Sequence, residues 1–327
     1  MKTVLNRAPC WLCFIGGLAL GAALPVTAQD YPAKPVRLVI PFPPGGSNDI
    51  VGRMIGQQLG DRLGKQFVVD NRGGAGGTIG TELAAKSPPD GHALLIISVA
   101  YAFNTSMYAK LPYDPVKAFN PVAMLGTGPN ALAVHPSVPV KTVKEFIALA
   151  KSKPGQLNYA SAGVGSFQHL GSELFRIMAG VNVVHVPFKG GAPAMIDVIS
   201  GQTQFCTGSL IQLLTHYRSG KLKLLGTGGA KRVGILPEVP TIAEAGVKGY
   251  EANNWWGLLA PAGTPPEIVK KLHAELSIIL KSAETQKRFS TEGAEAFEMS
   301  PDQFGKYIAS ETAKWGHVVK EAGIKAE

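Results

Sequence analysis

The sequence has 327 residues, of which 45% are hydrophobic and 17% are charged, and its formal net charge is +9. A chain of this length and apolar content can bury a large core, most simply in two domains, so an intrinsically disordered chain is excluded. Its basic residues are scattered, whereas nucleic-acid binding usually needs a basic stripe or a recognisable module. We therefore expect a folded protein that binds no nucleic acid and whose positive field favours small anions.

The first 28 residues are typical of a secretory signal peptide. They combine a positively charged start, an apolar stretch over 11–24, and small residues at 26–28, where a signal peptidase cleaves. A retained membrane anchor is the alternative, but the apolar stretch is shorter than the roughly 20 residues that a bilayer needs. We predict a signal peptide over 1–28, a mature chain that starts at Gln29, and a periplasmic location.

Cleavage at this position changes the charge and the cysteine count. Removal of Lys2 and Arg7 lowers the net charge from +9 to +7, and Cys10 and Cys13 leave with the signal peptide. Cys206 is then alone, so the mature chain can form no internal disulfide. We interpret Cys206 as a buried structural thiol, since free cysteine packs as a small hydrophobic residue.

Short apolar segments alternate with helical patterns along the mature chain, which is typical of α/β units around a largely parallel sheet. The expected strands are VRLVIPF, FVVDN, ALLIISV, LNYASAG, VNVVHVPF, TQFCTGS and LKLLGTG. Two helices should each lay one apolar stripe on the sheet. The stripes are Val51, Met54, Ile55, Leu59 and Leu63, and Phe167, Leu170, Leu174 and Met178. Two further helices are expected near the C-terminus, with Thr264 and Ser300 as N-caps.

The segment PFPPGGSND, residues 41–49, joins an expected strand to an expected helix. Gly45 and Gly46 allow a tight turn and a close approach of the backbone to a ligand. One of the polar residues at 47–49 can cap the following helix. The unpaired N–H groups at that helix start, together with the helix dipole, favour a carboxylate or a phosphate.

Two more glycine-rich corners follow the same strand-to-helix pattern. Residues 71–86 contain glycines at positions 73, 74, 76 and 77, and residues 160–175 contain Gly163, Gly165 and a potential cap at Ser166. Three glycine-rich corners contain more glycines than strand-to-helix turns alone require. Because ligands in open α/β sheets bind at the carboxyl ends of strands, we expect the corners to supply backbone donors to one anion.

Enzyme motifs are absent from these corners. The dinucleotide fingerprint G-x-G-x-x-G is incomplete, because Ile79 and Gln168 stand where its last glycine is required. The nucleophile elbow G-x-S-x-G is also incomplete, because Tyr159 stands in place of its first glycine. Neither a phosphate-binding loop nor an H-E-x-x-H motif occurs. We therefore predict no catalytic set, no metal site and no cofactor. An exported α/β hydrolase or transferase that acts on an anionic small molecule remains the alternative.

Six ordered motifs resemble those of the Bug (TctC-like) receptors, the extracytoplasmic solute-binding proteins associated with tripartite tricarboxylate transporters. The motifs are VRLVIPFPPGGSNDIVGR, VDNRGGAGGTIGTELAAKSPPDGHALL, YASAGVGSFQHLGSELF, VPFKGGAPAMIDVISGQ, LPEVPTIAEAGVKGYE and WWGLLAPAGTPPEIVKKL. The resemblance spans essentially the whole mature chain. One departure is Gly73, where a proline is expected.

The resemblance implies a periplasmic-binding-protein-like fold, with a ligand cleft between two α/β domains joined by crossing strands. Domain 1 would comprise residues 29–128 and 250–327, and domain 2 residues 129–249, with the crossing strands near 127–134 and 249–258. It further implies capture of a small carboxylate without catalysis, a monomeric state, and membrane transporter subunits as partners.

The resemblance also implies a set of cleft residues. The predicted ligand-binding residues are Phe42, Gly45, Gly46, Ser47, Asp49, Gly76, Gly77, Ser98, Asn104, Gly163, Gly165, Ser166 and Asp197. Asp49 can instead be only a helix cap, and Ser98 and Asn104 only strand-end residues. Trp255 and Trp256 can stack on an aromatic ligand or fill the junction between lobes, and we favour packing. The ligand therefore stays open among aliphatic di- or tricarboxylates, amino acids and aromatic acids.

Overall fold

The computed structural model describes residues 31–321, 323 and 324. The predicted signal peptide, its cleavage site and the first two cysteines lie outside the described residues. In the described part the strands are β1 (Val36–Ile40), β2 (Phe67–Asn71), β3 (Ala93–Ser98), β4 (Phe119–Val134), β5 (Asn158–Ser161), β6 (Val184–Pro187), β7 (Phe205–Ser209), β8 (Lys223–Thr227) and β9 (Asn253–Pro261).

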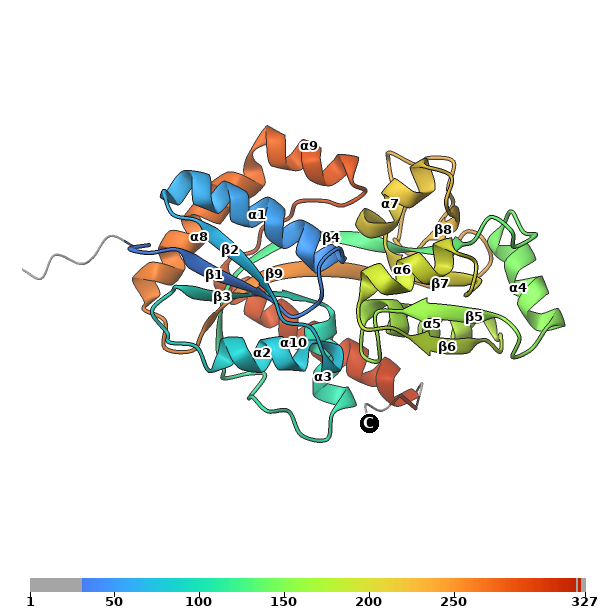
Figure 1. Ribbon diagram of the computed structural model, residues 1–327, viewed down its shortest axis with the longest axis horizontal. Coiled ribbons are helices and arrows are strands. Elements are labelled where there is room, and N and C mark those ends of the chain that lie inside the picture. The colour runs from blue at the N-terminus through green and yellow to red at the C-terminus, as the bar shows by residue number, and fades with distance from the viewer. Residues whose placement is uncertain (1–30, 322, 325–327) are drawn as a thin grey trace, which may run out of the picture. The chain divides into compact units, whose positions relative to one another are not determined.

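The helices alternate with these strands in the first two thirds of the chain and gather at its end (Figure 1). They are α1 (Ser47–Leu63), the 3-10 turn η1 (Ala75–Gly77), α2 (Thr78–Ala85), α3 (Ala100–Met107), α4 (Val143–Ser152), α5 (Phe167–Ala179), α6 (Gly191–Ile199), α7 (Leu210–Arg218), α8 (Pro266–Lys281), α9 (Ala283–Thr291) and α10 (Pro301–Glu321).

The long strand β4 belongs to two halves of one sheet. The strand order is β2-β1-β3-β9-β4-β7-β5-β6, and β8 also pairs with β4. Residues 119–129 of β4 pair with β9, and residues 130–134 pair with β7 and β8. We call β1, β2, β3, β9 and residues 119–129 the first half, and the remaining strands with residues 130–134 the second half.

All seven strands expected from the sequence are present, and the α/β class is confirmed. The sheet is mixed rather than largely parallel, because β9 pairs antiparallel with β3 and β4, and β4 pairs antiparallel with β7 and β8. The first part of β4 was missed. Its sequence contains Pro121 and Pro129, and proline argues against a strand because it donates no hydrogen bond to the neighbouring strand. The pairing of β4 with β9 accommodates this sequence through register shifts between Pro121 and Ala123 and between Met124 and Gly126.

Helices cover both faces of the first half: α1, α8 and α9 lie on one face, and α2, α3 and α10 on the other (Figure 1). On the second face, the Phe103 ring meets the Trp315 ring edge-on at 4.7 Å. Trp255 and Trp256 are fully buried, and Trp255 Nε1 donates to Glu311 Oε2 at 3.1 Å. The favoured interpretation of the tryptophan pair as packing residues is therefore confirmed.

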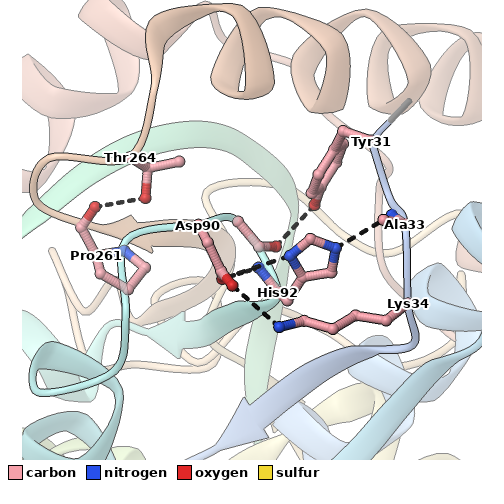
Figure 2. Close-up of polar contacts among 8 residues, drawn as sticks. Tyr31, Ala33, Lys34, Asp90, His92, Pro261 and Thr264 are labelled. Atoms are coloured by element: carbon pink, nitrogen blue, oxygen red, sulfur yellow. Dashed lines mark hydrogen bonds and ion pairs between the residues drawn. The ribbon is translucent and has the colours of Figure 1, made fainter. Parts of the chain in front are cut away.

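The predicted stripe of α1 is buried except for its last member, which is partly buried, whereas the stripe of α5 ends earlier than expected. Met178 is 39% exposed, and Phe175 is the buried residue near the end of α5. Ser300 is an N-cap, since its Oγ accepts from Gln303 N. The prediction for Thr264 was wrong, because its hydroxyl donates to the Pro261 carbonyl (Figure 2) and leaves α8 without a side-chain cap.

The first described residues are held against the loop that precedes β3 (Figure 2). Tyr31 donates its hydroxyl to the Gly91 carbonyl at 2.8 Å, Ala33 N donates to His92 Nε2 at 3.2 Å, and Lys34 pairs with Asp90. These contacts attach the first described residues to the first half of the sheet.

One further prediction concerns burial. Cys206 is buried in β7, and burial raises the pKa of its thiol to about 12, so the interpretation as a structural thiol is confirmed. Among the described residues, none of the helices has the length and apolar character needed to cross a bilayer.

Candidate ligand-binding site

A cavity of about 40 Å³ lies where strands from both halves of the sheet end. Its lining consists of Phe42, Gly46, Ser47, Asn48, Ser98, Ala162, Ser166, Phe167, Gln168, Gly191, Ser209, Gln212 and Asn254. This volume holds roughly three water molecules. The two halves therefore meet closely around the cavity, and a ligand larger than a few waters needs them to separate.

Helix N-termini form much of this lining. Gly46, Ser166 and Ser209 are the N-caps of α1, α5 and α7, and Gly191 is the first residue of α6. In Figure 1 the first turn of α1 faces the part of the molecule that carries α6 and α7. No side chain caps α1, α6 or α7, so their first N–H groups stay available. Four partial positive charges thus converge on one small volume.

The lining contains polar groups but no ionisable one. None of its thirteen described members is Asp, Glu, Lys, Arg or His. Among the described residues there is also no group of three side chains that could hold a metal ion. An anion in this cavity is therefore stabilised by backbone N–H groups, hydroxyls and amides.

The first glycine corner contributes through its backbone, and its acidic residue has a structural role. The Asp49 carboxylate accepts from Gly45 N, Arg53 and Asn71. Burial opposes ionisation of Asp49, but these three donors hold its pKa below the usual value. Asp49 and Gly45 lie outside the cavity lining, and the N-cap of α1 is Gly46 rather than a polar side chain.

The second corner lies beside the cavity rather than in its wall. Gly76 and Gly77 line a space of about 10 Å³ together with Phe42, Ser98 and Asn104. Asn104 Nδ2 donates to the Gly76 carbonyl at 3.1 Å, while its Oδ1 has no partner. The structure thus groups Gly76, Gly77, Ser98 and Asn104 with Phe42, and Phe42 and Ser98 line both this space and the main cavity.

The third corner is fixed by two histidines. Ser166 Oγ accepts from His169 N, as predicted for a cap, and Gly165 N donates to His169 Nδ1 at 3.4 Å. His185 Nε2 lies 2.6 Å from Ser161 Oγ, which accepts from Gly163 N. Burial lowers the pKa of both histidines to about 4. At neutral pH both rings are therefore uncharged and can accept these hydrogen bonds.

An outer cleft of about 870 Å³ adjoins the cavity. It is lined from the first half by Phe42, Gly76 and Gly77, and from the second half by Gly163 and Lys189, among others. Gly163 therefore faces this outer cleft. Gly165 packs on the second corner, because a Cβ on it would lie 3.6 Å from the Gly76 Cα.

Asp197 lies apart from all of these residues. Its Oδ2 accepts from Thr203 N at 3.1 Å near the end of α6, and it lines none of the cavities described above. Its carboxylate closes a turn after the helix, so the structure does not bring Asp197 to the predicted cleft.

Sequence reasoning missed five polar or amide residues of the lining: Asn48, Gln168, Ser209, Gln212 and Asn254. Ser209 could have been found, because it ends the expected strand TQFCTGS immediately before a helix, as the corner residues do. No local signal marks Asn254 inside a strand or Gln212 inside a helix.

Three of the side chains connect the halves at the cavity wall. Asn254 Nδ2 donates to Ser47 Oγ at 3.2 Å and to Ser209 Oγ at 2.9 Å. Ser209 Oγ also lies 3.3 Å from Ser47 Oγ. The starts of α1 in the first half and α7 in the second half are thus joined through one residue of β9.

The architecture and this neutral, helix-lined cavity define a periplasmic-binding-protein-like protein with its ligand site between two halves of an α/β sheet. Residues 51–324 match the family described as the tripartite tricarboxylate transporter family receptor, TctC. The chain belongs to this family, as the six motifs predicted. The family is one of solute-binding receptors, so the alternative of an exported enzyme is set aside.

Similar proteins include BugT from Bordetella pertussis, which is 37% identical over 307 residues, covering 93% of this chain and 94% of BugT. The structure of Rpa4515 from R. palustris with adipate has a TM-score of 0.88 at 37% identity, and the match covers 90% of this chain and 99% of Rpa4515. MatC from Rhodopseudomonas palustris with bound malate has a TM-score of 0.84 at 32% identity, covering 88% of this chain and 100% of MatC.

Proposed function

We propose that this protein is a periplasmic receptor that captures a small carboxylate between the two halves of its sheet and delivers it to a tripartite tricarboxylate-type transporter. The observation that carries the proposal is the cavity whose wall contains the starts of four helices and no ionisable side chain. Such a wall attracts one anionic group and offers no negatively charged partner to a cation.

The relatives support a carboxylate in particular. Rpa4515 is described with adipate and MatC with malate, and both ligands carry carboxylates. The proposed contacts are the backbone N–H groups after Gly46, Ser166 and Ser209, with Ser47 and Ser98 as hydroxyl donors. Phe42, Gly76, Gly77, Asn104 and Gly163 would form the surrounding wall.

Capture requires the halves to move as lobes. We propose that domain 1 comprises residues 29–128 and 250–327 and that domain 2 comprises residues 129–249. β4 and β9 would form the hinge, because residues 129 and 130 of β4 mark the change of pairing partners. Two crossing strands permit a rigid opening and closing. The export signal and the transporter subunits are part of the same proposal, and the chain would act as a monomer.

The test is a thermal-shift and calorimetry screen of the chain from residue 29 against malate, succinate, glutarate, adipate, citrate and benzoate, with turnover measured for each. Binding of at least one acid without product formation supports the proposal. The dimethyl ester of that acid should not bind, because charge-assisted hydrogen bonds are worth roughly 1.5–3 kcal/mol each. Equal shifts with acid and ester would overturn it.

A further inference from the structure

The cavity wall contains a pair of glutamines whose hydrogen bonds are incomplete. Gln168 lies in the first turn of α5 and Gln212 in the first turn of α7, and they are 4% and 8% exposed. Gln168 Nε2 donates to Gln212 Oε1 at 3.4 Å, while Gln168 Oε1 and Gln212 Nε2 have no partner. Buried amide atoms without partners are rare and need an explanation.

The pair presents one free acceptor and one free donor whichever way the two amides are turned. If both amides rotate by 180°, Gln212 donates to Gln168, and the free oxygen and the free N–H group change places. A ligand that satisfies both atoms therefore needs its own acceptor and its own donor. A carboxylate at neutral pH supplies only acceptors.

The backbone around the pair holds the amides close to the cavity. A Cβ on Gly191 would lie 2.7 Å from Gln212 Nε2, and a Cβ on Gly208 would lie 3.1 Å from Gln168 Nε2. Both amides thus lie against glycine backbone, and a side chain at either glycine would displace them. Gly191 itself lines the cavity at the start of α6.

We infer that Gln168 and Gln212 determine specificity for a carboxylate that carries a hydroxyl group, an inference that rests on the proposed function. The hydroxyl donates to the free amide oxygen, and it or the neighbouring carboxylate accepts from the free N–H group. An ammonium group would also donate, but the cavity has no carboxylate to pair with it and four helix N-termini to repel it. A hydroxy acid is therefore preferred over both the unsubstituted acid and the amino acid.

The experiment compares three matched series by calorimetry: succinate, malate and aspartate; glutarate, 2-hydroxyglutarate and glutamate; adipate, 2-hydroxyadipate and 2-aminoadipate. In the series that binds best, the hydroxy acid should bind about tenfold more tightly than the other two, since one satisfied buried hydrogen bond is worth about 1.4 kcal/mol. Gln168→Leu should remove this preference, because it should weaken binding of the hydroxy acid about tenfold more than binding of the unsubstituted acid.

The matched control is Gln156→Leu, at an exposed position outside the cavity, which should keep the preference. Gln212→Leu provides a second variant should the first fail to fold. The inference is wrong if the three acids of each series bind with equal affinity, or if both glutamine variants keep the preference for the hydroxy acid. In either case the proposed function as a carboxylate receptor is unaffected. If none of the nine acids binds, the inference is wrong, and the proposed function falls with it only if citrate and benzoate also fail to bind.

Discussion

Replacement of Asn254 by Asp tests whether the cavity binds an anion. Asn254 is 1% exposed and joins Ser47 and Ser209 through its amide nitrogen. A carboxylate has the same shape, and both serine hydroxyls can turn to donate to it. The negative charge would lie among the helix N-termini, which stabilise it, so the variant should fold.

The expected loss of affinity follows from the charge. At an effective dielectric constant of about 20, two negative charges about 6 Å apart repel by roughly 3 kcal/mol. This energy corresponds to about a hundredfold weaker binding. The true loss is larger if the new carboxylate also occupies the donors that the ligand uses.

The assay is calorimetry with whichever of malate, succinate and adipate binds best, and Asn253→Asp is the matched control. Asn253 is the neighbouring residue of β9, half-buried and outside the cavity, and its Nδ2 donates to Glu251 Oε1 at 3.0 Å. Successive residues of a strand point to opposite faces, so the same charge change is placed away from the ligand. Wild-type affinity in Asn254→Asp, or an equal loss in both variants, would refute the anion-binding proposal.

Acidification should destabilise the protein, because burial lowers the pKa of His169 to about 4, and the unfolded chain binds more protons between pH 6.5 and 4. Stability should therefore fall through this window, with His169 alone contributing up to about 3 kcal/mol, and equal urea midpoints at pH 7 and pH 4.5 would contradict this. Gly45→Ala should lower the free energy of unfolding by roughly 1–2 kcal/mol, since Gly45 has φ +82° and a Cβ there meets Ala192 at 3.2 Å. Gly46→Ala should lower the free energy of unfolding by less than Gly45→Ala does, because Gly46 has φ −86° and its added Cβ meets only the Pro43 oxygen at 3.9 Å. A larger loss for Gly46→Ala in the same denaturation experiment would refute the argument. Small-angle scattering should show a change in the radius of gyration when a confirmed ligand saturates the protein, because the closely packed halves leave a cavity of only about 40 Å³, and an unchanged radius would count against motion of the lobes.

The glycine corners could be predicted because each is encoded in a few consecutive residues. A strand, two small residues and a capping side chain are local features, and the corner at Gly163 and Ser166 has the expected cap. The sequence does not show which glycine of a corner needs the backbone conformation that only glycine adopts easily. The sequence assigned the same role to Gly45 and Gly46, whereas in the structure only Gly45 of the two has a positive φ.

The remaining cavity residues depend on contacts between distant segments, which no local pattern encodes. Asn254 reaches Ser47 across 207 positions and Ser209 across 45. Gln212 lies on a helix whose pattern shows only that one face is apolar, and its role follows from the approach of Gln168. The same limit explains β4, whose prolines obscure a strand that pairing with β9 determines.

The neutral side chains of this cavity can be explained by the energy of the closed state without a ligand. A buried arginine would remain as an unpaired charge in the closed, empty state, at a cost of several kcal/mol. Hydroxyls and amides can instead bond to one another, as Asn48 does with Ser98 at 3.2 Å and Asn254 with two serines. The glutamine pair is the part of the wall where this mutual bonding is incomplete. A ligand gains most binding energy from polar atoms that have no hydrogen-bond partner in the empty cavity. Discrimination between carboxylates should therefore depend on Gln168 and Gln212 more than on the helix N-termini, which attract every carboxylate.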